Sequence, residues 1–447
     1  MNDLYLLNNK YAEYLYFEVA KDLPLIDYHN HLNYEDIAAG NLYDDMSAAW
    51  ILLDGYKHRA MRICGVDEEF ITGSASRKEK FISWCKTVPM LFGGPLYDWS
   101  KKELHDVFGI ELDINAENAD AIWEQTNAAL ATDKFSAKGL YDHFNVKYSA
   151  PCTEIQAPLA PFDAVESMVP SLRADNLLIP SMATVGFLSE NAKLAIRTID
   201  DYIAAISHRL DAFSDKGCCF SDHSLDNGFR YKRDGILATS AFRKLINEET
   251  LSEEERLALE SEMLVRLSGE YAARGWTLQL HMGSQRTTST RIKRLPNACG
   301  GYAAIGNSID VNSLVHLLDD MEQSEHGLPR KVIIYTLNPI DNAVNAILSG
   351  SFVGVTQGPA WWWCDHLQGM RDMLDHFANY SVLSTFVGMN TDSRSIMSLC
   401  RHDYFRRTFC GWIGEKVERG ELPYDKDILT EITRRVCYEN ALRLFEE

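Results

Sequence analysis

Short apolar runs along this chain alternate with longer segments in which apolar residues recur every three or four positions. Eight of the runs are rich in valine, isoleucine and leucine, which is typical of strands buried on both faces of a parallel sheet. The predicted strands are Leu23–His31, Val146–Pro151, Leu177–Met182, Cys218–His223, Thr277–Met282, Val332–Leu337, Phe352–Gln357 and Leu383–Met389. Strands separated by helical patterns indicate βαβ units.

The segments between the strands predict amphipathic helices. One apolar stripe, at spacings of four, three, four and three residues, consists of Ile199, Ile203, Ile206, Leu210 and Phe213. Further helices are predicted over Val311–Met321, Leu367–Tyr380 and Ser395–Arg419. Eight βα units favour a TIM-like (β/α)₈ barrel, in which catalytic groups lie at the carboxyl ends of the strands. An open doubly wound sheet is the alternative architecture.

The interval between the first two predicted strands is too long for a simple βα connection, because it spans residues 32–145. Its helical patterns cover Lys57–Ile63, Arg77–Thr87, Lys101–Phe108 and Asn115–Leu130. We therefore predict a barrel with C-terminal helices, built from residues 1–34 and 141–447, and a helical insertion subdomain over residues 35–140. This subdomain is expected to lie over the top of the barrel and help to close the site. A subdomain that only packs against the barrel is the alternative.

Composition and charge narrow the classes of protein that remain. The 447-residue chain has a formal net charge of -20, which argues against sequence-independent binding to nucleic acid or to an anionic membrane. No apolar run reaches the roughly 18 residues that a membrane span requires. Its ten cysteines form no Cys-x-x-Cys pair and are expected to be reduced thiols. We expect a cytoplasmic protein that acts on a small molecule. We also expect a homo-oligomer, because homo-oligomers are common among soluble proteins.

Candidate metal ligands stand at the ends of three predicted strands. His29 and His31 close the first strand, and side chains two positions apart on a strand point the same way. His281 ends the fifth strand and Asp392 follows the eighth. In a barrel these side chains become neighbours, and the set suits a divalent metal, Zn²⁺ above all, with an open position for substrate or water. Alternatively, His281 is a core histidine and Asp392 caps the next helix.

Together these segments resemble the uronate isomerase family of the amidohydrolase superfamily. The resemblance runs over nearly the whole chain and is closest in the C-terminal half. The most specific segments are Asp27–His31, His281–Gly283, Thr391–Ser395 and Arg401–Arg407. Segments Asn41–Tyr43, Gly55–Arg62, Ser221–Asp226, Leu337–Pro339 and the Trp361-Trp362 pair with Asp365 are also similar to the family.

The resemblance implies a metal-containing barrel that interconverts D-glucuronate with D-fructuronate, or D-galacturonate with D-tagaturonate. It implies that His29, His31 and Asp392 bind the metal, with His281 as an additional ligand. Arg394 is expected beside the metal, in contact with substrate oxygens. The residues expected around the sugar are Tyr56, Arg59, His223, Arg286, Trp361 and Trp362.

The chain departs from the family pattern after two predicted strands. Where the family has Pro-x-x-Arg-Pro-Asp after its third strand, the predicted third strand here leads into Ile179–Phe187, which contains no arginine. Where the family has Thr-Asp-Asp-Pro after its second strand, this chain has Thr153–Pro158. Bidentate pairing with arginine supplies both energy and geometry to carboxylate recognition. We therefore expect Arg286, Arg291 or another arginine to replace the contact, or a sugar acid other than a standard hexuronate.

An aldose–ketose isomerase moves a proton from C2 to C1, which requires a positioned base and stabilisation of an ene-diolate. We expect Asp392, or a metal-bound hydroxide beside it, to remove the C2 proton, with Arg394 and Tyr56 polarising the sugar oxygens and the metal orienting the substrate. His29 or His31 is the alternative base. The rival function is hydrolysis by a metal-activated water, because a fold alone does not settle function.

Overall fold

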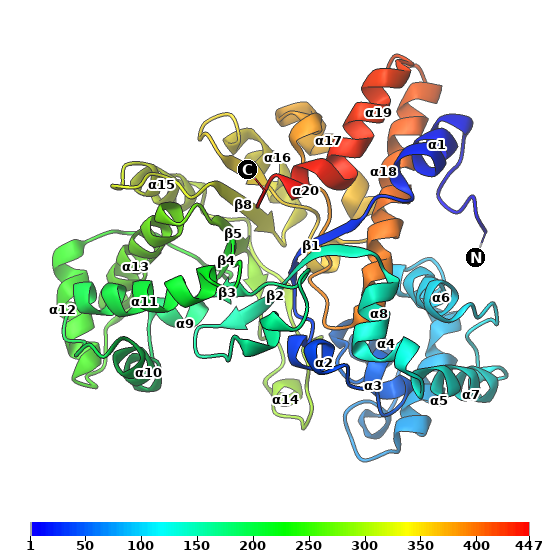
Figure 1. The fold of residues 1–447 in the computed structure, drawn as a ribbon, viewed down its shortest axis with the longest axis horizontal. Helices are drawn as coiled ribbons and strands as arrows, with labels where there is room; N and C mark the ends of the chain where they lie inside the picture. Colours follow the sequence, from blue (N-terminus) through cyan, green and yellow to red (C-terminus); the bar gives the residue numbers. More distant parts are fainter. Residues whose placement is uncertain (1, 447) are drawn as a thin grey trace.

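The computed structural model describes residues 2–446 and has a curled sheet of seven parallel strands at its centre (Figure 1). The strands are β1 (Leu25–Asn30), β2 (Val146–Glu154), β3 (Ser171–Arg173), β4 (Phe220–Leu225), β5 (Thr277–Met282), β8 (Lys331–Thr336) and β9 (Val355–Gln357). Strands that follow one another in this series are hydrogen-bonded neighbours in space, and all pairs are parallel. This is the strand order of a (β/α)₈ barrel, as predicted. A short antiparallel pair, β6 (Ser284–Gln285) and β7 (Ala304–Ile305), lies outside the sheet.

The position predicted for the third strand is wrong. Residues Leu177–Met182 cover the end of helix α9 (Asp175–Leu178), a turn, and the start of helix α10 (Met182–Ala192). The strand β3 lies just before them and is only three residues long. So short a strand leaves no apolar run to recognise, whereas Leu177 and Leu178 are buried through a helix. As a consequence, Arg173 is the residue that ends the third strand.

The segment predicted as the eighth strand closes the barrel without forming a strand. Leu383–Thr385 is a 3₁₀ turn, and the backbone N–H of Asp392 then donates to His29 O at 3.1 Å. The N–H of His31 returns a bond to Ser393 O at 2.9 Å. Gly388 has φ of 76°, outside the β region, which interrupts a regular strand here. Backbone hydrogen bonds to β1 therefore replace a strand ladder.

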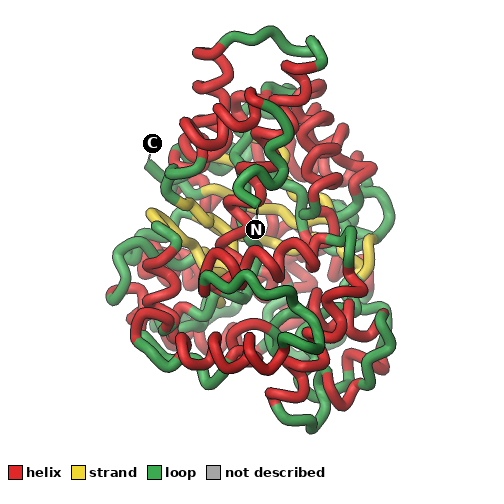
Figure 2. Tube along the Cα trace, turned by 90° about the vertical axis from the view of Figure 1, so that its right-hand side faces the viewer, coloured by secondary structure: helices red, strands yellow, loops and turns green. Residues whose placement is uncertain are grey.

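Helices surround the sheet on its outside, and Figure 2 shows the strands enclosed between them. Those between β1 and β2 are α2 (Tyr34–Ala39), α3 (Met46–Trp50), α4 (Gly55–Ile63), α5 (Arg77–Thr87), α6 (Pro95–Phe108), α7 (Ala119–Leu130) and α8 (Ala137–His143). Those between β4 and β9 are α12 (Gly235–Ile246), α13 (Glu253–Ala273), α14 (Thr290–Lys293), α15 (Val311–Glu322) and α16 (Asn342–Leu348). Helix α11 (Ile199–Ser214) lies between β3 and β4, and its predicted apolar stripe is buried.

The inserted helices share a core with the barrel. One continuous apolar cluster contains Trp50 of α3 and Trp84 of α5 as well as Leu278 of β5 and Val332 of β8. The helices predicted over Arg77–Thr87 and Lys57–Ile63 are confirmed as α5 and within α4. A subdomain bounded at residues 35 and 140 stays a prediction, because the shared core marks no boundary there.

A second apolar cluster joins the two ends of the chain. Helices α1 (Lys10–Leu15), α17 (Leu367–Tyr380) and α18 (Arg401–Glu418) contribute to it, together with α19 (Lys426–Arg434). Figure 1 shows α1, α18 and α19 side by side at the edge of the barrel, and α20 (Asn440–Leu442) near the C-terminus. Within residues 2–446, no helix combines the length and the apolar character that crossing a bilayer demands.

Candidate active site

His29 and His31 face one carboxylate at the carboxyl end of β1. The Nε2 atoms of His29 and His31 lie 3.3 Å and 3.0 Å from Oδ1 of Asp392. Burial raises the pKa of the Asp392 carboxyl, but hydrogen bonds from the two histidines outweigh burial and hold this pKa well below its ordinary value. The two histidines and Asp392, which is more than 360 positions away in the chain, therefore form one compact group of nitrogen and oxygen donors.

The backbone and a tryptophan fix the carboxylate of Asp392. Its φ is 47°, in the left-handed region that aspartate visits more readily than most residues. Its second oxygen, Oδ2, accepts a hydrogen bond from Nε1 of Trp361 at 2.8 Å. One carboxylate oxygen thus faces the histidines and the other faces the tryptophan. Strained backbone of this kind is found at functional sites, where surrounding structure holds it in place.

His281, at the end of β5, is buried with unused ring nitrogens. It is 3% exposed, and its ring stacks on Tyr335 at a centroid distance of 4.4 Å. Within residues 2–446 neither of its nitrogens has a hydrogen-bond partner, and Oδ2 of Asp222 lies 3.9 Å from its Nδ1. Burial holds the pKa of His281 well below its ordinary value, so the ring is neutral, the form that binds metals. A bound ion is one way to satisfy buried polar atoms that have no protein partner.

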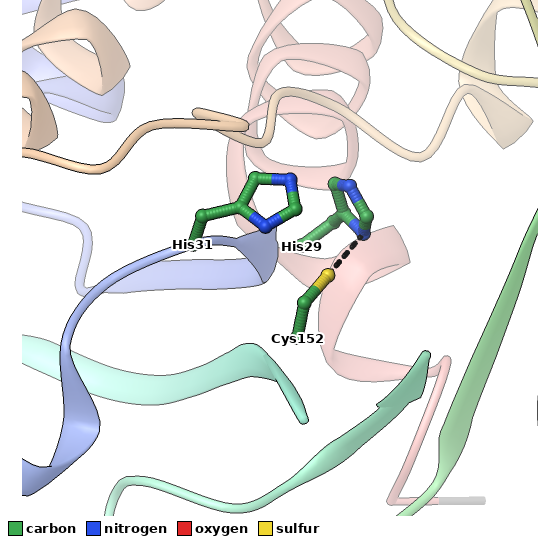
Figure 3. A group of neighbouring side chains, drawn as sticks. All are labelled: His29, His31 and Cys152. Carbon is green, nitrogen blue, oxygen red and sulfur yellow. Dashed lines mark hydrogen bonds between the residues drawn. The ribbon is translucent and has the colours of Figure 1, made fainter. Parts of the chain in front are cut away.

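The chemistry of these donors fits a divalent metal ion. His29, Asp222 and His281 offer ligand atoms within 4.8 Å of one another, and so do His29, His31 and Cys152. Imidazole nitrogen, carboxylate oxygen and thiol sulfur are the ligands that zinc and similar metals accept. Figure 3 shows His29 of β1, His31 directly after that strand, and Cys152 of β2 turned toward one another. We conclude that the site can hold a divalent metal.

A cavity of about 490 Å³ opens above these donors. It lies at the carboxyl ends of the strands, where barrel enzymes carry their active sites, and its volume is that of a small-molecule site. Helix α4 of the inserted segment contributes Gly55 and Tyr56 to its wall. The predicted site residues that line it are His29, His31, Tyr56, His281, Arg286, Trp361, Trp362, Asp392 and Arg394.

Three arginines line the cavity. Arg173 pairs with Asp175 at 2.9 Å and lies 3.5 Å from Asp222, and Arg286 donates from Nε to Asp226 at 2.8 Å. Arg394 is exposed to the cavity, and its guanidinium forms no hydrogen bond or ion pair to any residue from 2 to 446. A guanidinium without protein partners is free to bind a ligand.

The arginine predicted to be absent after the third strand is therefore present as Arg173, and the departure predicted after that strand is wrong; the departure predicted at Thr153–Pro158 stays a prediction. With β3 in its observed place, residues 170–175 read Pro-Ser-Leu-Arg-Ala-Asp, so Arg173 stands where Pro-x-x-Arg has its arginine. Only the proline after that arginine is replaced, by Ala174. The error followed from the misplaced strand. Arg291, the other suggested replacement, is not among the residues that line the cavity.

The buried carboxylate of Asp365 lies within hydrogen-bonding distance of the Tyr56 hydroxyl at the cavity wall. The Tyr56 hydroxyl lies 3.4 Å from both carboxylate oxygens of Asp365, and Nη1 of Arg401 lies 3.4 Å from Oδ2. Burial, against the opposing charge of Arg401, raises the pKa of Asp365 from 3.8 to about 7. This pair was not predicted as a unit, although Asp365 belonged to a segment similar to the family.

Two predicted substrate-binding residues are not brought to this cavity. His223 points to the other face of β4, where its Nε2 lies 3.2 Å from the hydroxyl of Tyr271 in α13. Burial lowers the pKa of His223 to about 4. The guanidinium of Arg59 lies 5.1 Å from the ring centroid of Trp363 and lines a neighbouring groove instead.

Sequence reasoning missed Asp222, Arg173 and Cys152. Because side chains alternate along a strand, Asp222 and His223 cannot both point inward, and the choice between them was open from the pattern. Cys152 stood among ten scattered cysteines with no spacing to mark it. Its place at the end of β2, beside the end of β1, was the available signal.

Comparison with known proteins agrees with this geometry. The family model described as glucuronate isomerase matches residues 1–445. Uronate isomerase of Photorhabdus laumondii is 38% identical over 470 aligned positions, covering 100% of this chain and 98% of that protein. Uronate isomerase of Bacillus licheniformis is 37% identical over 462 positions, covering 100% and 97%. The crystal structure of uronate isomerase from Thermotoga maritima superposes with a TM-score of 0.92 at 29% identity, covering 100% of this chain and 99% of the other.

The fold and the site define an α/β-barrel enzyme with a group of metal-type ligands at the carboxyl ends of its strands. The full-length match to the family model and the identity to curated relatives then give the family. The chain belongs to the glucuronate isomerase family, and it is an isomerase.

Proposed function

We propose that this protein interconverts the aldose and ketose forms of hexuronates, D-glucuronate with D-fructuronate and D-galacturonate with D-tagaturonate. The observation that carries the proposal is the convergence of His29, His31 and Asp392 beside an arginine-lined cavity. Family membership supports it, because the relatives are named uronate isomerases. We further propose that the protein works as a cytoplasmic homo-oligomer.

His29, His31 and Asp392 would hold one divalent metal, with His281 as an additional ligand. We propose Zn²⁺, because imidazole and carboxylate ligands with an open position suit it. When bound, the metal supplies Lewis-acid polarisation of sugar oxygens and orients them. The unpartnered nitrogens of His281 support its role, since coordination satisfies a buried atom that has no protein partner.

Arginines supply recognition of the sugar carboxylate. Arg394 lies at the cavity with its donors unused, and Arg173 and Arg286, each paired with carboxylates, line the same cavity. The chain as a whole carries a net charge of -20, so an anionic substrate depends on this local cluster. With Arg173 in its family position, a standard hexuronate needs no altered specificity.

Proton transfer from C2 to C1 needs a base and a stabiliser of the ene-diolate. We assign the base role to Asp392, whose carboxylate lies at the cavity floor. Arg394 and the Tyr56 hydroxyl would donate hydrogen bonds to the sugar oxygens as negative charge develops on them. Asp365, hydrogen-bonded to Tyr56, orients that hydroxyl.

The test is a panel of hexuronates and neutral aldoses incubated with the zinc-loaded protein in D₂O and followed by NMR. The proposal expects ketose signals from uronates, with no change of mass apart from deuterium uptake. Reaction of neutral aldoses but not of uronates would contradict the proposed substrate class. Opening of an ester or lactone with incorporation of ¹⁸O from labelled water, and no ketose, would instead identify a metal-dependent hydrolase.

A further inference from the structure

Cys152 lies against the Nδ1 edge of His29, whereas the Nε2 edge of the same ring faces Asp392. Its Sγ is 3.7 Å from Nδ1 of His29 and 3.8 Å from Oδ1 of Asp222 (Figure 3 shows the first contact). Both distances are within reach of a hydrogen bond to sulfur. A thiol can accept one hydrogen bond and donate another, so the sulfur can link the histidine to the carboxylate. Asp222 is fully buried and lies 3.5 Å from the guanidinium of Arg173, which anchors the far end.

The two ring nitrogens of His29 face different partners. Nε2 lies 3.3 Å from Asp392, and Nδ1 faces the sulfur of Cys152. These nitrogens are on different edges of the imidazole, so one ring cannot direct both lone pairs at the same ion. A metal bound on the Asp392 side therefore leaves Nδ1 as the N–H donor. Histidines that bind metals nearly always donate this other N–H, usually to oxygen, which fixes the tautomer and the ring orientation.

We propose that Cys152 is a positioning residue that accepts the Nδ1–H of His29, donates its S–H to Asp222, and so holds Nε2 of His29 toward the metal. This inference rests on the metal site of the proposed function. It assigns a role to a residue that directly precedes Thr153–Pro158, one of the segments predicted to depart from the family pattern. The series of contacts His29–Cys152–Asp222–Arg173 then connects the ends of β1, β2, β3 and β4, so one network links the metal site to Arg173 at the cavity.

The test compares Cys152→Ala, which can neither accept nor donate, with Cys152→Ser, which can do both. Cys219→Ala is the matched control, because this half-buried thiol donates to the carbonyl of Gly217 at 3.4 Å and is not among the residues that line the cavity. Zinc affinity is measured by competition with a chelator, and Co²⁺ is substituted to record the absorption spectrum. Folding of each variant is checked by its thermal transition.

The expected result is a loss of zinc affinity on the order of 10–100-fold for Cys152→Ala. Cys152→Ser should recover most of this loss, and Cys219→Ala should match the wild-type protein. The Co²⁺ protein should lack the intense near-ultraviolet band of a sulfur–cobalt bond. Unchanged affinity in Cys152→Ala would overturn the inference. So would a sulfur–cobalt band that this variant loses, because the sulfur would then be a direct ligand.

The outcomes also separate this inference from the proposed function. A wild-type protein that binds zinc but isomerises no uronate contradicts the proposed function, while the affinities of the variants still decide the role of Cys152. A wild-type protein that isomerises uronates while Cys152→Ala binds zinc normally contradicts only the role of Cys152. A wild-type protein that binds no zinc contradicts both.

Discussion

Asp27 accepts two hydrogen bonds from Thr391, one from its backbone N–H at 2.7 Å and one from its hydroxyl at 2.8 Å. Asp27 is fully buried on β1, and Nε2 of His402 lies 3.1 Å from the same carboxylate. Thr391 directly precedes Asp392, so these bonds set the position of the carboxylate that faces His29. The strand that carries the histidines thus also holds the segment that carries the acid.

Thr391→Val should loosen this connection while keeping the shape of the side chain. It removes the hydroxyl's hydrogen bond to the buried Asp27 carboxylate, which corresponds to about 1.5–3 kcal/mol of unfolding free energy, and the weaker 3.3 Å bond that the hydroxyl accepts from the Ser393 N–H. Zinc affinity should fall as well, because Asp392 is the next residue. Urea denaturation and chelator competition measure the two effects. Thr239→Val, on the exposed face of α12, is the control. Loss of stability with unchanged zinc affinity would show that the connection does not reach the metal site.

Trp361→Phe should lower the catalytic efficiency while it keeps an aromatic ring beside His281. The ring centroids of Trp361 and His281 lie 4.9 Å apart, and a phenylalanine ring keeps this contact. The 2.8 Å hydrogen bond from the indole Nε1 to Oδ2 of Asp392 is lost. A hydrogen bond to a charged group corresponds to about 1.5–3 kcal/mol. We expect kcat/KM for glucuronate to fall roughly 10–100-fold. Trp362→Phe keeps the Asp392 bond and serves as the comparison. Equal losses in both variants would assign the effect to aromatic packing alone.

Arg394→Met should reduce binding of the sugar acid. This guanidinium lines the cavity with no partner in the described chain, so its loss leaves no buried carboxylate unpaired. We expect kcat/KM to fall by roughly 10–100-fold or more, since charged hydrogen bonds to substrate oxygens disappear. Arg291→Met, an exposed arginine of α14 outside the cavity lining, should retain wild-type kinetics. Steady-state kinetics with glucuronate decide between them, and a fall in both variants would contradict the assignment.

Asp365 should make stability depend on pH. Burial raises its pKa from 3.8 to about 7, so in this window the folded protein binds a proton that the unfolded chain has lost. Stability is therefore lost as pH rises from about 4 toward 7, at up to about 1.4 kcal/mol per pH unit. Asp365→Asn lacks this titration, so its unfolding free energy relative to wild type should increase with pH. Urea denaturation of the chelator-treated proteins between about pH 5 and pH 8 measures the difference. Parallel curves would mean that Asp365 is ionised throughout.

The sequence pattern predicted the barrel because long, regular elements carry strong periodic signals. Helices α5 and α17 have the predicted bounds, and β5 was predicted residue for residue. The short strand β3 and the irregular closing segment carry no such signal. Their geometry depends on neighbours far away in the chain, such as the bonds from Asp392 and Ser393 to β1. Local patterns do not contain that information.

The site residues could be predicted from the sequence where the strand that carries them was placed correctly. His29, His31 and His281 stand at the ends of strands that were placed correctly, and the structure brings them together with Asp392. Arg173 was lost because its strand was misplaced by a few residues. Asp222 was not predicted, because the sequence alone does not define the register of β4 against β3 and β5. That register decides which face of β4 points into the barrel.

The most direct test of the account is a metal titration of activity. The protein is freed of metal with a chelator, and ketose formation from glucuronate is measured as zinc is added back. The account predicts no turnover without metal and a linear rise that ends at about one equivalent per chain, as a single site requires. Asp392→Asn should show no such rise. Full isomerase activity in the metal-free protein would contradict the account.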